Sequence, residues 1–506
     1  MTRSRLAAWN LGTLVLFTAA TAALGLATAR PLVRLLGEER YGAARMVLEA
    51  QGYLSLLELG IGGALGPLLA RGVGAGDDIG ATRTLAAGLR SSLRAGAAML
   101  VLGLAATPWV GRLVPVGPGL QPDLRWAWLA GLAAAPLVAL SPLRSLAEAG
   151  QRGYRVNLAL TAQAAAASAS ALGLASLGAG IAGQVGAATI GATLAASLLA
   201  LDAARRHPGL LRRAIAGGAD RRSAADLRRH GGAALAAALC GRVGLLTDLL
   251  VVGNLLGPAS ATTLLLTQRL PTLGLAPLQG VGNASWAAMA QMHREGDRAG
   301  FADRLVELTG LVAALGVAGL VPAFAFNRAF FDLWMPGRAY GGDLVALVAA
   351  ANMLLWAVAS LWGWCFAGLG RVGRTLPAQA AGAALNLGAS LWLTRRLGLV
   401  GPLLGTTVAL AGVQLWALPA LLRRDHGVPI RRLLGAVAGP LAIGLPAGAA
   451  LWSFARWRPP TGWASLAAAV AGSASGLLLL SWLVLLDAAS RSRWRHRLAA
   501  IRPGAA

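Results

Sequence analysis

The sequence predicts an all-α polytopic membrane protein with about 14 transmembrane helices, arranged as two six-helix pseudo-symmetric lobes followed by two C-terminal helices. Three observations support this fold class. First, 56% of the 506 residues are hydrophobic and only 13% are charged, whereas about 25% of a water-soluble chain is charged. Second, apolar runs of about 20 residues recur along the chain, and each is long enough to cross a hydrocarbon core about 30 Å thick. Third, the chain contains an internal repeat of six such runs.

Fourteen apolar runs follow one another along the chain. The first begins after Arg3 and Arg5, and it is longer than the roughly 7–15 apolar residues of a signal peptide, so we expect a retained helix. The runs lie near residues 10–33, 43–69, 95–115, 125–147, 155–177, 180–201, 233–256, 262–290, 305–327, 343–367, 375–394, 398–421, 434–455 and 464–486.

The net charge of +25 could suggest a nucleic-acid partner, but the distribution of the arginines indicates membrane topology instead. All 45 basic residues are arginine. With the N-terminus in the cytoplasm, the cytoplasmic segments hold 30 of them, the external loops hold 10, and 5 fall within or at the ends of the runs. The positive-inside rule predicts this bias, so we expect both termini in the cytoplasm and no nucleic acid. Some loop arginines can also bind anionic lipid headgroups.

Several enzymatic chemistries have no support in the sequence. Cys240 and Cys365 lie in separate runs without a neighbouring histidine, which argues against a metal site or a disulfide framework. The motif GLGRVG at 368–373 matches a dinucleotide-binding pattern, but it follows an apolar helix rather than a strand. A chain without lysine cannot form a P-loop, so ATP is not expected to drive the protein. We expect no enzyme activity and no cofactor.

The chain is a duplication. Residues 35–78 align with 255–298 at a constant offset of 220, and a second block aligns at an offset of 218. The coinciding residues include Gly37 with Gly257, Asp77 with Asp297, and Gly180 with Gly398. Each copy holds six runs, an even number, so the copies share one orientation and an axis along the membrane normal should relate them. The expected domains are an N-lobe at 1–201, a cytoplasmic Arg-rich linker at 202–232, a C-lobe at 233–422, and two further helices with a basic cytoplasmic tail at 423–506.

Short motifs add a family resemblance. The stretch LLGEERYG, followed by YLSLLELGIGGAL and then GAGDD, resembles the start of bacterial polysaccharide flippases of the multidrug/oligosaccharidyl-lipid/polysaccharide (MOP) exporter superfamily. LLGPASATTLLLTQRL, NASWAAMAQ and REGDRAGF agree in the second half, and the resemblance covers most of the first twelve runs. The sequence departs from the pattern at Ala261, opposite Tyr41, and at GLAPLQG, opposite LLELG.

The resemblance implies a V-shaped, two-lobed transporter in the bacterial inner membrane. It would pass a polyprenyl-pyrophosphate-linked oligosaccharide between leaflets by alternating access, for surface polysaccharide biosynthesis such as that of the O-antigen of lipopolysaccharide. Two further C-terminal spans are familiar in the branches that handle lipid-linked sugars, whereas the drug-exporting branch usually has twelve. The expected partners are the lipid-linked oligosaccharide, membrane lipids and, if transport is ion-coupled, H⁺ or Na⁺.

Ionisable residues inside the runs are the candidate substrate-binding residues, because a charge at the centre of a span costs about 2.5–3.5 kcal/mol and normally faces a protein interior or a wet cavity. Arg45 and Glu49 are four residues apart on one helix, so a local ion pair is an alternative role. Glu58 can instead stabilise a helix end. Arg269 occupies the repeat position of Glu49 and has no acid within four residues. The residues expected to line a central cleft are Arg45, Glu49, Arg242, Asp248 and Arg269.

Polar and aromatic residues could serve the sugar. Arginine forks bind phosphate oxygens through two parallel hydrogen bonds, which suits a pyrophosphate headgroup. A wide lumen for the oligosaccharide could use Gln268, Asn283 and Trp286, together with Gln163 and Gln379, although helix packing explains these equally well. Pro271 and Pro277 should interrupt the eighth run and bend it.

Two other function classes were compared with the flippase. A cation-coupled multidrug exporter of the same superfamily would use Glu49 or Asp248 for coupling, and it predicts a negative cleft, whereas three arginines stand against two acids here. A membrane-embedded glycosyltransferase would need catalytic acids or histidines in a long external loop, and the sequence contains no such loop.

Overall fold

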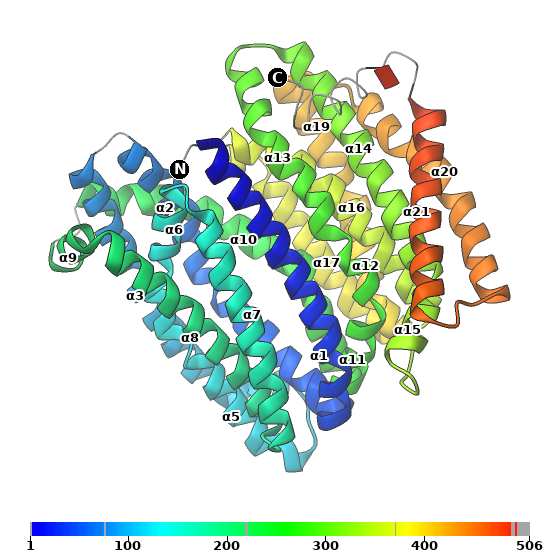
Figure 1. The fold of residues 1–506 in the computed structure, drawn as a ribbon, viewed down its shortest axis with the longest axis horizontal. Helices are drawn as coiled ribbons and strands as arrows, with labels where there is room; N and C mark the ends of the chain where they lie inside the picture. The colour runs from blue at the N-terminus through cyan, green and yellow to red at the C-terminus, as the bar shows by residue number, and fades with distance from the viewer. Residues whose placement is uncertain (1–2, 75–76, 218–220, 370, 487–490, 493–506) are drawn as a thin grey trace. The chain divides into compact units, whose positions relative to one another are not determined.

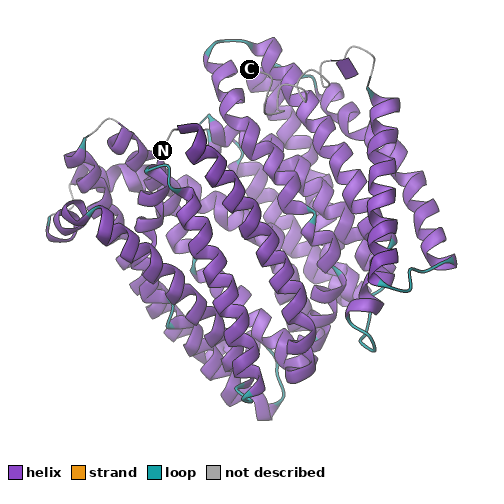
Figure 2. Cartoon of the chain, viewed as in Figure 1, coloured by secondary structure: helices purple, strands orange, loops and turns teal. Residues whose placement is uncertain are grey.

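The computed structural model describes residues 3–74, 77–217, 221–369, 371–486 and 491–492. Within these ranges every regular element is a helix, and no strand is present (Figure 2). Ten helical segments are long and apolar enough to cross a membrane, or eleven if a bent pair within residues 235–256 counts as one span. The described chain is therefore an all-α, multi-pass membrane protein, as the sequence predicts.

Some neighbouring predicted runs are joined in one helical segment that is long enough to cross the membrane twice. The first two runs share the segment Trp9–Glu58, and the eleventh and twelfth share Leu376–His426. The eighth run is divided among three helices of 10, 5 and 20 residues. The two joined segments have 50 and 51 residues, about 75 Å at 1.5 Å per residue, which exceeds two crossings of a core about 30 Å thick.

The described chain divides into two compact units, one formed by residues 1–263 and 394–398 and the other by residues 264–393 and 399–506. The expected C-lobe began at residue 233, whereas residues 233–263 pack within the first unit. The helices of the first unit are α1 (Arg3–Leu54), α2 (Leu56–Gly74), α3 (Asp78–Ala106), α4 (Val110–Leu113), α5 (Gln121–Leu132), α6 (Ser141–Ala149), α7 (Gly153–Ser176), α8 (Gly180–Arg206), α9 (Pro208–Ala216) and α10 (Arg221–Leu256), and α11 (Pro258–Thr267) begins there (Figure 1).

The second unit continues from the end of α11. Five of its helices, α13, α14, α16, α19 and α20, contribute to one apolar core. The helices are α12 (Arg269–Leu273), α13 (Leu275–Arg294), α14 (Arg298–Ala325), α15 (Asn327–Trp334), α16 (Asp343–Gly368), α17 (Leu376–Leu397), α18 (Gly401–Ala409), α19 (Leu415–His426), α20 (Ile430–Trp457) and α21 (Trp463–Leu485), with a π-helical turn at Leu410–Gln414 between α18 and α19.

Repeat-related positions share the same backbone features. Gly37 has φ 80° and its counterpart Gly257 has φ 92°, a left-handed region that glycine enters without steric cost. The pair at the second offset, Gly180 and Gly398, has φ 55° and 64°. The N-terminal caps also match. The Asp77 carboxylate accepts a hydrogen bond from the Gly80 N–H at 2.8 Å, and the Asp297 carboxylate accepts one from the Gly300 N–H at the same distance. The duplication read from the sequence is therefore also a duplication of local structure.

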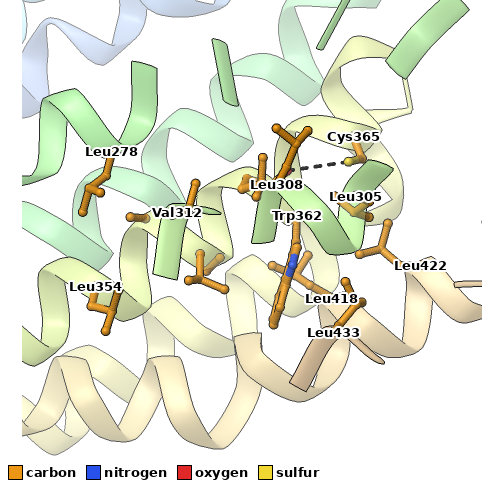
Figure 3. Close-up of a cluster of buried hydrophobic side chains, with 14 of the residues drawn as sticks. Leu278, Leu305, Leu308, Val312, Leu354, Trp362, Cys365, Leu418, Leu422 and Leu433 are labelled. Carbon is orange, nitrogen blue, oxygen red and sulfur yellow. Dashed lines mark hydrogen bonds between the residues drawn. The ribbon is translucent and has the colours of Figure 1, made fainter. Parts of the chain in front are cut away.

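The core of the second unit forms around Trp362 of α16 (Figure 3). Leu305, Leu308 and Val312 of α14 contact this core from one helix, while α19 and α20 contribute further leucines. The Trp362 side chain is fully buried, and its indole N–H donates to the Thr309 hydroxyl at 3.0 Å, so burial leaves no unpaired donor. Apolar packing thus holds α14, α16, α19 and α20 together.

Candidate functional site

Four of the five candidate charges lie in the first unit, where α1 and α10 pack against each other (Figure 1). Arg242 of α10 reaches α1: its Nη2 lies 3.3 Å from Glu49 Oε2. The guanidinium also lies over the Tyr53 ring, 5.4 Å from its centroid. Because Glu49 and Tyr53 are four residues apart, they form one face of α1, and Arg242 bridges that face.

Gly52 provides the space that Arg242 occupies. A Cβ atom at Gly52 would lie 1.6 Å from Arg242 Nη2 and 2.5 Å from its Cζ, both far too close. A side chain there would therefore force the guanidinium to move. The sequence places glycine three residues after Glu49, on the same face, and this spacing lets a long cation lie flat against the helix backbone.

Arg45 does not form the local pair with Glu49 that the sequence allowed. Its Nη2 donates to the Tyr41 hydroxyl at 3.3 Å, and its guanidinium lies 5.2 Å from the Tyr41 ring centroid. The ion pair of Glu49 is with Arg242 instead. In the described part of the chain, the charge of Arg45 therefore rests beside a neutral phenol rather than against a carboxylate.

Asp248 lies six residues beyond Arg242 on α10, nearly two helical turns away. Its side chain is buried, with 8% exposed. The neighbouring Thr247 hydroxyl is 2.8 Å from the Tyr53 hydroxyl, so Tyr53 contacts both Arg242 and Thr247. The α1–α10 contact thus contains two acids, one cation and two hydroxyls, and Arg45 lies one turn away along α1.

Arg269 belongs to the second unit and opens α12, the middle piece of the broken eighth run. Proline lacks an N–H, so each proline frees the carbonyl four residues before it. Thr267 is four residues before Pro271 and Leu273 is four before Pro277, and these are the last residues of α11 and α12. The predicted bend is therefore present as two breaks, and Arg269 lies between them. Broken helices at membrane depth are typical of substrate sites in transporters.

The carbonyl freed at Thr267 has a partner from a distant part of the second unit. Asn327, which is buried, donates from Nδ2 to the Thr267 carbonyl at 2.9 Å. The Thr267 hydroxyl accepts a hydrogen bond from the Gly341 N–H, also at 2.9 Å. Since an unpaired buried carbonyl costs free energy, these bonds stabilise the break beside Arg269.

The other candidate residues occupy three places. Gln268 is half-buried in the break between α11 and α12. Asn283 and Trp286 lie one turn apart on α13, and both are exposed. Glu58 lies in the first turn of α2, where an acid is favourable beside the helix dipole, in line with the structural role considered for it.

Sequence reasoning missed several residues of these groups. It did not identify Gly52, Tyr53 and Thr247, which surround Arg242, or Asn327, which holds the broken helix. Tyr53 could have been found from its spacing of four from Glu49. Asn327 offers only a weak signal, as a polar residue at the end of a strongly apolar run, because its partner is 60 residues away.

Comparisons with known proteins identify the fold. No protein-family model matches the chain, and no curated protein sequence matches it. Among solved structures, the lipid II flippase MurJ in an inward closed conformation is similar, with a TM-score of 0.68 and 12% identity over 92% of this chain and 97% of that one. An inward-facing multidrug resistance MATE family transporter of the MOP superfamily has a TM-score of 0.64 and 16% identity, over 80% of this chain and 96% of its own.

A third similar structure is a MOP superfamily transporter from Pyrococcus furiosus Vc1, with a TM-score of 0.61 and 16% identity over 83% of this chain and 96% of that chain. The predicted resemblance is thus confirmed at the level of the fold, which these three transporters share across nearly their whole length. The chain has the fold of MOP superfamily transporters.

Proposed function

We propose that this protein is a flippase that moves a polyprenyl-pyrophosphate-linked oligosaccharide across the bacterial inner membrane for surface polysaccharide biosynthesis. In this proposal Arg45, Arg242 and Arg269 bind the pyrophosphate during passage. Gln268, Asn283 and Trp286 contact the sugar, and Glu49 and Asp248 set the positions of the cations. The two six-helix repeats act as the moving lobes.

The observation that carries the proposal is the polar group of α1 and α10. A cation that bridges Glu49 and Tyr53 inside apolar helices costs free energy, so its presence argues for a functional role. Arg45 adds a second cation, whose guanidinium contacts the Tyr41 phenol. Arginine forks bind phosphate oxygens in pairs, and a compact polyanion is the ligand they suit best.

The fold is compatible with this function and with its rival. One similar structure is a lipid II flippase, while others are multidrug transporters. The rival function, cation-coupled drug export, would use Glu49 as the coupling carboxylate. Glu49 is already paired with Arg242 at 3.3 Å, so a coupling ion or a cationic drug would have to compete with that guanidinium for the carboxylate.

The test uses a strain that normally makes a surface polysaccharide and from which this gene has been deleted. Surface polysaccharide is measured after complementation with each variant. Complementation with Arg269→Ala should abolish export at normal protein abundance, and Arg269→Lys should restore it only in part, because lysine lacks the bidentate fork. Arg395→Ala, at an exposed arginine, is the matched control. Normal export from well-expressed Arg269→Ala would remove this residue from the substrate path.

The same strain separates the two functions. If the protein exports cationic drugs, Glu49→Gln should abolish drug resistance and leave polysaccharide export unchanged. If it is the flippase, polysaccharide export should fall with the arginine variants, and drug resistance should not depend on the gene.

A further inference from the structure

An apolar groove lies in the second unit, on helices α14, α16 and α20. Its volume is about 500 Å³, within the range of about 300–1,000 Å³ typical of ligand sites. α14 lines it from Gly316 to Phe324. Both α16 and α20 pack on α14 and form the two walls. Apart from Asp343 and the indole N–H of Trp452, every lining side chain is apolar or glycine.

Charged and aromatic residues gather at one end of the groove. Asp343, in the first turn of α16, accepts hydrogen bonds at 2.9 Å from both Trp452 Nε1 and Arg456 Nη2 of α20. The Arg456 guanidinium lies 4.6 Å from the Trp452 ring centroid. Arg458 follows two residues later, directly after the last residue of α20, and lies 4.8 Å from the Trp457 ring centroid. Two arginines against one aspartate leave this end positively charged, and tryptophans at this level are typical of the membrane interface.

The depth of the groove matches one leaflet of a bilayer. The lining residues of α16 run from Asp343 to Leu354, and those of α20 run from Leu441 to Trp452. The eleven steps between the first and last of these residues, at 1.5 Å each, give a length of about 16 Å on both walls. Half of a hydrocarbon core about 30 Å thick is about 15 Å. The groove therefore reaches from the interface to the middle of the membrane and ends there.

Large apolar side chains of the groove are open to their surroundings. Leu445 is 69% exposed, Leu344 is 55% exposed and Leu347 is 44% exposed. Together with the positive end and the one-leaflet depth, these exposed leucines define the chemistry of the occupant: a single hydrocarbon chain that carries an anionic group at the interface.

We propose that this groove binds one phospholipid, with an acyl chain between α16 and α20 and its phosphate at Arg456 and Arg458. An acyl chain and a cationic contact together give the two signals that lipid binding usually requires. On the topology inferred from the arginines, the lipid belongs to the outer leaflet of the inner membrane. The site holds a resident lipid and does not depend on which substrate the protein moves.

The first test fills the groove. The purified full-length protein is incubated in detergent with phosphatidylglycerol, and retained lipid is counted by native mass spectrometry. Wild type should retain one phosphatidylglycerol. Ala351→Trp places an indole in the groove at a lining residue that is itself exposed, and it should lower retention about tenfold. Ala468→Trp, at an exposed position of α21 outside the groove, should retain the lipid as wild type does.

The second test removes charge without adding bulk, so it still tests the phospholipid site if Ala351→Trp fails to fold. Arg456→Gln combined with Arg458→Gln should lower phosphatidylglycerol retention about tenfold, because charge-assisted hydrogen bonds are lost. Retention of uncharged diacylglycerol should not change. Equal retention of phosphatidylglycerol by wild type and this double variant overturns the assignment of the phosphate.

Two further outcomes would overturn the proposal. Displacement of phosphatidylglycerol by an equimolar polyprenyl phosphate would assign the groove to the tail of a transported lipid. A wild-type dimer that retains no phospholipid would assign it to a second copy of the chain. The proposed transport function fails separately, since Arg269→Ala should stop export and leave phosphatidylglycerol retention unchanged.

Discussion

Gly52 illustrates how one missing side chain can determine where a charge lies. The Arg242 guanidinium lies against the backbone of Gly52, and a single Cβ atom at Gly52 would occupy the space that it needs. Gly52→Ala should therefore displace the guanidinium from Glu49 and reduce polysaccharide export about tenfold or more, while protein abundance stays normal. Abundance should hold because alanine is intrinsically better than glycine in a helix by about 1 kcal/mol, and a flexible arginine can move aside.

Gly12→Ala on the same helix is the control, since a Cβ atom there meets nothing within 4 Å. Export by Gly52→Ala at the wild-type level, with Gly12→Ala also normal, would show that the position of Arg242 does not matter for transport.

The Glu49–Arg242 pair is open to a thermodynamic test at the same scale. Its side chains are 27% and 21% exposed, so the pair is only partly screened by solvent. In a double-mutant cycle of Glu49→Gln and Arg242→Gln, the stability losses of the two single variants should sum to more than the loss of the double variant, by a coupling free energy of about 1 kcal/mol. Thermal unfolding in detergent measures it. A coupling of zero would mean that the ion pair seen here contributes nothing to the fold.

Sequence reasoning found the charged residues but not their partners. Arg45 and Glu49 were identified by their cost inside an apolar run, and Arg242 by the same argument. Their pairing could not be predicted, because Glu49 and Arg242 are 193 residues apart and no local spacing relates them. Glu49 forms its ion pair with Arg242 of another helix, and not with Arg45, the local alternative.

At the scale of elements, the eighth run shows what proline does to a membrane helix. The ends of α11 and α12 could be predicted from Pro271 and Pro277, because each proline frees a fixed carbonyl. Asn327→Ala should leave the Thr267 carbonyl without its donor and lower the free energy of unfolding by about 1–3 kcal/mol. Asn283→Ala, at an exposed asparagine of the same unit, should change it by less than about 0.5 kcal/mol. Equal melting temperatures for the two variants would contradict the role given to Asn327.

The matched N-terminal caps give a second prediction for elements. Asp77→Ala and Asp297→Ala should each cost about 1 kcal/mol, since both remove the acceptor of an N-terminal N–H. The asparagine variants keep an acceptor and should lose little. Unequal losses at the two positions, measured by denaturation of the purified protein, would show that the repeats no longer use the same cap.

At the scale of the whole molecule, the fold class followed from hydropathy and the duplication from glycine and aspartate positions, and the structure bears out both. The way in which neighbouring runs are connected could not be predicted from hydropathy. Gly37 has non-helical φ/ψ between the first two runs, and Gly398 has φ 64° between the eleventh and twelfth, so a single glycine separates two runs where hydropathy shows no loop.

The arginine distribution predicts the topology. Reporter fusions after residues 230 and 502 should both be active only as cytoplasmic reporters, and a fusion after residue 118 should be external, because most loop arginines stay in the cytoplasm. An alkaline phosphatase and a green fluorescent protein fused at each site provide opposite readouts and so control for expression. An external C-terminus would mean an odd number of spans.

The bond between Asn327 and the Thr267 carbonyl also constrains how the protein is made. The ribosome adds Asn327 60 residues after Thr267, which takes roughly 3–12 s at about 5–20 residues per second. For that time the nascent chain holds a broken segment whose carbonyl has no intramolecular donor. Biogenesis of the second half therefore has a vulnerable interval, and chains that stop before residue 327 should be those that membrane quality control degrades first.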